Sequence, residues 1–130
     1  MNEHELAKKY YDEARDFLED KILQEPDDSR FHSALGIAYA RLGRREDAIR
    51  EGKKGVDLLP ITKDAWRGVY RAKELAQIYV MVGEFDLAMD QIEDLLSRPG
   101  YLSIHWLRLD PAWAPLRDHP RFKKLLKEGK

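Results

Sequence analysis

The 130-residue sequence contains no cysteine, so it can form no disulfide framework, no thiolate metal site and no cysteine nucleophile. It also lacks a charge excess, because 23 basic residues stand against 24 acidic ones, which leaves no global field to recruit nucleic acid or anionic lipid. No apolar run approaches the length of a membrane span, and polar, acidic residues rather than a signal sequence follow Met1. We therefore expect a cytoplasmic protein without nucleic-acid or membrane partners.

Motifs for catalysis and cofactor binding are missing as well. The four histidines, His4, His32, His105 and His119, show no metal-ligand spacing. Gly52 and Gly55 fall inside an expected helix with no strand before them, so they form no phosphate-binding loop. No nucleophile motif occurs either. We expect no catalytic residue, no metal and no cofactor, and an enzyme is only a remote alternative.

The residues that are present indicate one globular domain. Charged residues make up 36% of the chain and hydrophobic residues 43%, a balance typical of a folded protein. The length suits a single domain over residues 1–130 with a continuous core.

Small and aromatic residues recur at a fixed spacing in this chain. The segment with Leu35, Gly36, Tyr39, Gly43 and Ala48 returns as Leu75, Ala76, Tyr79, Gly83 and Ala88. Ala14 lies 34 residues before Ala48, whereas Ala48 lies 40 residues before Ala88, six residues more. Apolar residues three and four apart predict helices, and the glycines between them predict turns, with Gly43 as a left-handed helix end. We expect antiparallel helix pairs whose seams are formed by the small residues, and no strands.

These residues, with Pro60 and the 34-residue step, resemble the tetratricopeptide repeat (TPR) family over residues 8–100. The resemblance implies an all-α fold: a right-handed solenoid of helical hairpins, followed here by a non-repeat helical C-terminal cap. We divide the domain into a partial repeat at 1–28, a full repeat at 29–60, a full repeat with a six-residue insertion at 61–100, and a capping tail at 101–130. The tail is similar to the ends of TPR regions in bacterial multidomain signalling regulators.

The resemblance also implies that a protein or peptide binds along the concave face, which the first helix of each pair lines. Outward positions on two such helices supply the candidate groove: Arg30, Ser33, Ile37, Arg41, Tyr70, Lys73, Gln77 and Met81. Basic groups beside an aromatic ring and a methionine suit an acidic or C-terminal segment. We therefore expect a non-catalytic scaffold, as the regulatory or C-terminal portion of a larger signalling protein.

The N-terminal segment leaves a second function open. Residues 8–24 supply only the second helix of a repeat, so the apolar side of this helix (Tyr10, Ala14, Phe17 and Leu18) lacks part of its cover. A homodimer through this helix would supply the cover, as would chain upstream of Met1. Self-association is therefore the alternative to ligand binding.

Two segments depart from the repeat. Residues 61–66 either extend the following helix from an N-cap at Thr62 or form a loop that carries Trp66. The proline-rich tail predicts helices over residues 103–109, after Pro111 and over 120–127. We expect the three tryptophans to be core or cap residues. The tail side chains expected to cover the helix at residues 84–97 are Trp106, Leu107, Leu109, Trp113, Leu116 and Phe122.

Overall fold

The computed structural model describes residues 2–98 and 104–128, and within them every regular element is helical. The prediction of an all-α protein is therefore confirmed. The elements are α1 (Glu3–Gln24), α2 (Ser29–Arg41), α3 (Arg45–Leu58), α4 (Gly68–Met81), α5 (Phe85–Leu96), α6 (Ile104–Leu109), the 3₁₀ helix η1 (Pro111–Leu116) and α7 (Pro120–Glu128). The expected helix start at residue 103 and the end of the last repeat at Pro99 and Gly100 lie outside the described residues.

Polar caps and glycines set the ends of these helices. The side chains of Asn2 and Asp28 accept hydrogen bonds from backbone N–H groups in the first turns of α1 and α2. Gly43 and Gly83, after α2 and α4, have φ angles of 78° and 81°, which only glycine adopts without strain. The predicted left-handed end at Gly43 is confirmed.

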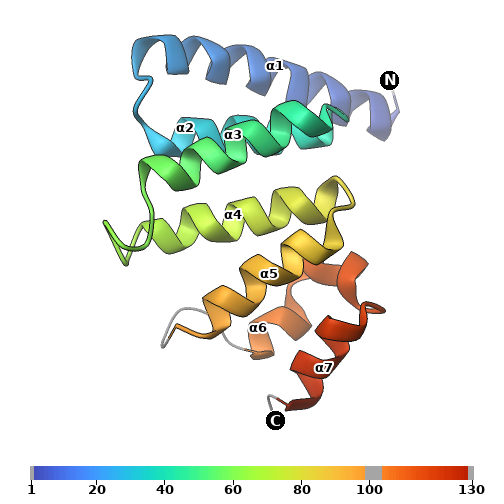
Figure 1. Ribbon diagram of the computed structural model, residues 1–130. Coiled ribbons are helices and arrows are strands. Elements are labelled where there is room, and N and C mark those ends of the chain that lie inside the picture. Colours follow the sequence, from blue (N-terminus) through green and yellow to red (C-terminus); the bar gives the residue numbers. More distant parts are fainter. Residues whose placement is uncertain (1, 99–103, 129–130) are drawn as a thin grey trace.

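Successive helices from α1 to α5 run in opposite directions and follow one another along the molecule (Figure 1). The pairs α2–α3 and α4–α5 pack most extensively, α1 packs on α2, and α4 contacts both α2 and α3. The hydroxyl of the buried Tyr39 on α2 donates a hydrogen bond of 2.7 Å to the carboxylate of Glu19 on α1. Burial, and then this bond to a carboxylate, raises the pKa of Tyr39 to about 12. This contact ties the first helix to the stack.

Small residues form the seams between helices, as the spacing predicts. Ala48 and Ala88 are fully buried. A Cβ at Gly36 would lie 3.0 Å from the backbone oxygen of Ala48, so α2 and α3 can approach closely only because no side chain is present. Gly52 leaves room for side chains of α4, with Ile78 Cδ1 2.8 Å from the position of a Cβ. Gly55 in turn leaves room for Ser33 of α2, so the two glycines inside α3 allow close packing against both neighbouring helices.

The C-terminal elements cover the apolar side of α4 and α5. Leu107, Trp113, Leu116 and Phe122 are buried in one cluster with residues of these two helices. Trp106 is partly buried and stacks edge to face on Trp113, with 5.1 Å between ring centroids. These side chains take the positions that the sequence predicts.

Leu109 is the exception among the expected covering residues. It is 80% exposed at the last position of α6, so its predicted place over α5 is wrong. The chain turns at Asp110, whose side chain accepts a hydrogen bond from the backbone N–H of Ala112 and starts η1. This turn directs Trp113 rather than Leu109 toward the core.

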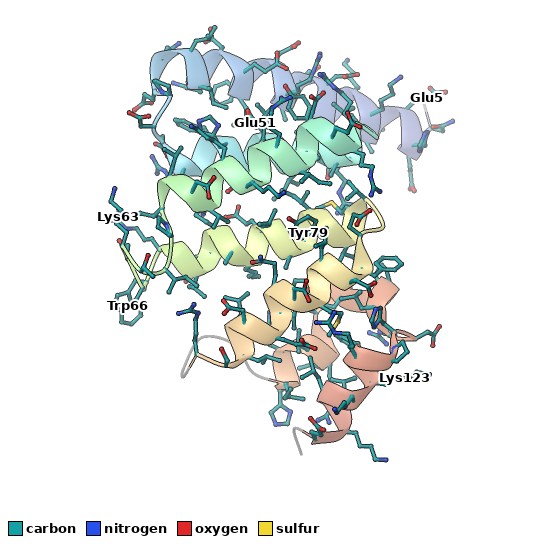
Figure 2. All side chains as sticks on the ribbon, viewed as in Figure 1. Glu5, Glu51, Lys63, Trp66, Tyr79 and Lys123 are labelled. Atoms are coloured by element: carbon teal, nitrogen blue, oxygen red, sulfur yellow. The ribbon has the colours of Figure 1, made fainter. Side chains whose placement is uncertain are left out.

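Residues 61–67 form turns and do not extend α4, which begins at Gly68. The backbone N–H groups of Trp66 and Arg67 donate to the Asp64 carboxylate, and Thr62 lies in the turn instead of capping a helix. Trp66 is 81% exposed and points away from the helices at this turn (Figure 2). The prediction of a core or cap role for Trp66 is therefore wrong, and the loop alternative is correct.

Candidate binding face on α2, α4 and η1

Four of the eight predicted groove residues line one hollow of the molecule. Ile37 and Arg41 come from α2, and Gln77 and Met81 come from α4. Each pair is four residues apart, so its members share one face of their helix. Because α2 and α4 pack side by side, these two faces combine into one surface.

We call this hollow the Arg41 hollow; it measures about 520 Å³. Its lining consists of Ile37, Ala40, Arg41, Gln77, Val80, Met81, Pro111, Ala112 and Pro115. Aliphatic side chains and two proline rings supply most of the lining, with one amide and one guanidinium. Such a surface can bind an apolar group and a hydrogen-bonding or anionic group side by side.

Arg41 supplies the positive charge of the hollow. Nearby, Arg44 is held by Asp47 at 2.7 Å, and Arg45 pairs with Glu84. Arg41 is exposed and has no carboxylate within ion-pair distance in the part of the chain that the structure describes. Its five N–H donors are therefore available to an incoming carboxylate.

Two further predicted residues, Arg30 and Tyr70, line a different hollow of about 750 Å³ at the N-terminal ends of α2 and α4. Its three arginines are paired: Asp28, which also lines the hollow, holds Arg30 at 2.7 Å, and Asp64 and Glu74 hold Arg67 and Arg71 at 2.8 Å and 2.7 Å. The hydrogen bond from Arg30 lowers the pKa of Asp28. Glu25, Asp27 and Lys63 also line this hollow and have no ion-pair partner among the described residues, so its unpaired charges are of both signs, whereas Arg41 is the one charged residue of the Arg41 hollow.

Ser33 and Lys73 do not line the Arg41 hollow. Ser33 is fully buried, because Gly55 on α3 leaves a gap that the serine hydroxyl fills; the predicted surface position of Ser33 is wrong. The Lys73 ammonium lies 4.7 Å from the centre of the Trp106 ring, so it packs against the C-terminal elements.

A smaller hollow of about 210 Å³ lies between α1, α2 and α4. Tyr10, Tyr11, Ala14, Leu18, Ala34, Ile37, Ala38 and Glu74 line it. Ile37 also lines the Arg41 hollow, so the two hollows meet at this side chain. Burial raises the pKa of Glu74, although Arg71 lies 2.7 Å away and opposes the shift.

Sequence reasoning missed the part of η1 that closes the Arg41 hollow: Pro111, Ala112 and Pro115. The Asp-Pro pair predicts a short helix there. Nothing in its spacing indicates that this helix contacts α4, because that contact depends on how the tail folds back. Glu74 was missed because its charge suggests a solvated position.

Neither a membrane-spanning helix nor a metal cluster occurs in the described part of the chain. Among residues 2–98 and 104–128, no helix combines the length and apolar character that a membrane span requires. Within the same ranges, no three histidine, aspartate or glutamate side chains are placed to hold a metal ion.

No family model, no curated protein and no solved structure matches this chain.

Proposed function

We propose that this chain is a non-catalytic scaffold that binds a protein or peptide segment in the Arg41 hollow. The observation that carries the proposal is the convergence of Ile37, Arg41, Gln77 and Met81 with the prolines of η1 in one hollow. The aliphatic and proline surface suits an apolar side chain of the ligand, and Arg41 suits an acidic side chain or a C-terminal carboxylate.

The chemistry of the lining favours binding over catalysis. Arginine stays protonated in proteins, glutamine does not titrate, and the other lining residues carry only alkyl groups, apart from the thioether of Met81. None of these side chains supplies a nucleophile or a proton donor near neutral pH.

In this proposal the helix pairs α2–α3 and α4–α5 are two TPR-like repeats of a right-handed solenoid. The support is their antiparallel packing and the burial of Ala48 and Ala88 at corresponding positions of α3 and α5. On this view α1 belongs to a partial repeat and α6, η1 and α7 form the cap. The chain then serves as the regulatory portion of a larger signalling protein.

Selection from a library of random peptides displayed on phage tests the function directly. We expect the wild-type chain to enrich peptides that combine an apolar residue with Asp, Glu or a free C-terminus. Arg41→Glu should weaken their binding about tenfold or more, the value of a lost charge-assisted hydrogen bond.

The matched control is Lys54→Glu, which makes the same charge change at an exposed position of α3, outside the Arg41 hollow. It should leave binding unchanged. The proposal fails if no peptide is enriched, or if enriched peptides bind the Arg41→Glu and wild-type chains equally.

A further inference from the structure

Charge is distributed unevenly along the helical stack, although the whole chain is nearly neutral. Residues 2–28, which include α1, hold ten acidic and four basic residues. Residues 104–128, which include α7, hold three acidic and six basic residues. Figure 1 shows α1 and α7 at opposite ends of the molecule, so the two ends carry opposite charge.

One exposed side of α1, called its outer face below, is largely apolar; Tyr10 at its edge also lines the hollow of about 210 Å³, and the Lys21 ammonium lies 5.6 Å from the centre of the Phe17 ring. Leu6, Tyr10 and Phe17 are 54%, 65% and 59% exposed, although they share one face of the helix at a spacing of four and seven. Glu13 lies between Tyr10 and Phe17 on this face. It is exposed and pairs with no cation in the part of the chain that the structure describes. Glu3, three residues before Leu6, is a second exposed carboxylate without an ion pair on this side, and an apolar stripe with two such carboxylates suits a basic partner.

The outer face of α7 offers such a partner surface. Phe122 is buried and Arg121 is held by Glu93 at 2.6 Å, so these two residues fix α7 on α5. Lys123 and Lys127, four residues apart, are exposed and have no ion-pair partner among the described residues. Their alkyl chains can cover aromatic rings while their ammonium groups reach a carboxylate.

We infer that the outer face of α1 in one copy of the chain binds the outer face of α7, with Lys123 and Lys127, in a second copy, head to tail. This inference is independent of the proposed ligand site, because neither face lines the Arg41 hollow. A symmetric contact of α1 with α1 would place two acidic segments against each other. The head-to-tail contact instead joins opposite charges, and the resulting dimer keeps one free α1 face at one end and one free α7 face at the other for further copies.

Sedimentation equilibrium on the full chain tests the association. In about 0.01 M salt, where charges act over about 30 Å, the average mass should rise above the 15.2 kDa monomer as the protein concentration increases. In about 1 M salt, where the range falls to about 3 Å, the dissociation constant should increase at least about tenfold. A monomer at every salt and protein concentration would overturn the inference.

Two double variants distinguish head-to-tail from symmetric association. Tyr10→Gln with Phe17→Gln removes the apolar stripe of α1, and Lys123→Gln with Lys127→Gln removes the charges of α7. All four positions are exposed, so the fold should be retained, which circular dichroism checks. Each variant alone should be a monomer. Their mixture should form a one-to-one dimer, because one intact α1 face and one intact α7 face remain.

Matched controls make equal changes elsewhere: Trp66→Gln with Tyr70→Gln, two exposed aromatic residues outside α1, and Lys53→Gln with Lys54→Gln on α3. Both controls should associate like the wild-type chain. A lysine variant that still dimerises would show symmetric contact through α1, and a mixture that stays monomeric would show that the two faces do not bind each other. Either result would overturn the head-to-tail arrangement.

Discussion

Glu74 is a carboxylate held where its charge is disfavoured. Burial between α1, α2 and α4 raises its pKa above the usual 4.5, because desolvation outweighs the attraction of Arg71 and Lys73. A carboxyl group with a raised pKa stabilises the fold at low pH. That stability is lost as the pH rises through the pKa of the folded state, since the unfolded chain releases the proton more easily.

Glu74→Gln should therefore stabilise the protein at pH 7. It should have little effect well below pH 4.5, where Glu74 is protonated in the folded and in the unfolded chain and is as uncharged as glutamine. Urea unfolding at several pH values measures this difference. The control is Asp57→Asn, which neutralises an exposed carboxylate on α3. Its free energy of unfolding relative to wild type should not rise with pH. A Glu74→Gln chain that is less stable than wild type at pH 7 would show that the ion pair with Arg71 outweighs desolvation.

The seam between α2 and α3 shows how one missing side chain sets the distance between two elements. A Cβ at Gly55 would lie 2.1 Å from the Ser33 hydroxyl oxygen and 3.2 Å from the backbone oxygen of Ser29. The Ser33 hydroxyl is itself buried without a hydrogen-bond partner among the described residues. The two helices therefore depend on glycine at this position.

Gly55→Ala should destabilise the fold by about 1–3 kcal/mol through overpacking, despite the better helix propensity of alanine. Ser33→Ala should recover part of this loss in the double variant, because it removes the nearest atom. Thermal or urea unfolding of the two single variants and the double variant measures the coupling. A Gly55→Ala chain more stable than wild type would contradict the close packing of this seam.

The helices themselves follow from local signals that are visible in the sequence. The spacing of apolar residues correctly predicts the helices. Gly43 correctly predicts a helix end, and the Asp110-Pro111 pair predicts the start of η1, since each signal acts within a few residues of the chain. Residues 61–67 form turns because Asp64 binds the backbone N–H groups of Trp66 and Arg67, a local alternative that competes with helix formation.

The candidate site was only partly predictable, for a different reason. Helical spacing correctly groups Ile37 with Arg41 and Gln77 with Met81. It cannot indicate that Gly55 draws Ser33 into the interior, or that η1 folds back against α4, because both depend on contacts between residues far apart in the sequence. Long-range packing therefore decides which outward positions become a shared surface.

At the scale of the whole molecule, the proposed binding surfaces differ in character and lie on different parts of the stack. The Arg41 hollow combines alkyl groups with one free guanidinium, and it is formed where α2, α4 and η1 meet. The outer faces of α1 and α7 carry opposite charge at the two ends. In the two proposals, the ligand segment and the second copy would therefore occupy separate surfaces.

The proposed function requires that a peptide segment binds in the Arg41 hollow. Backbone NMR of the chain, titrated with a peptide from the phage selection, locates the binding surface most directly. We predict that the largest shift changes occur at Ile37, Arg41, Gln77, Met81 and Ala112, with little change on the outer side of α3 around Lys53 and Lys54. Changes that cluster on α3, or along the outer face of α1, would contradict it.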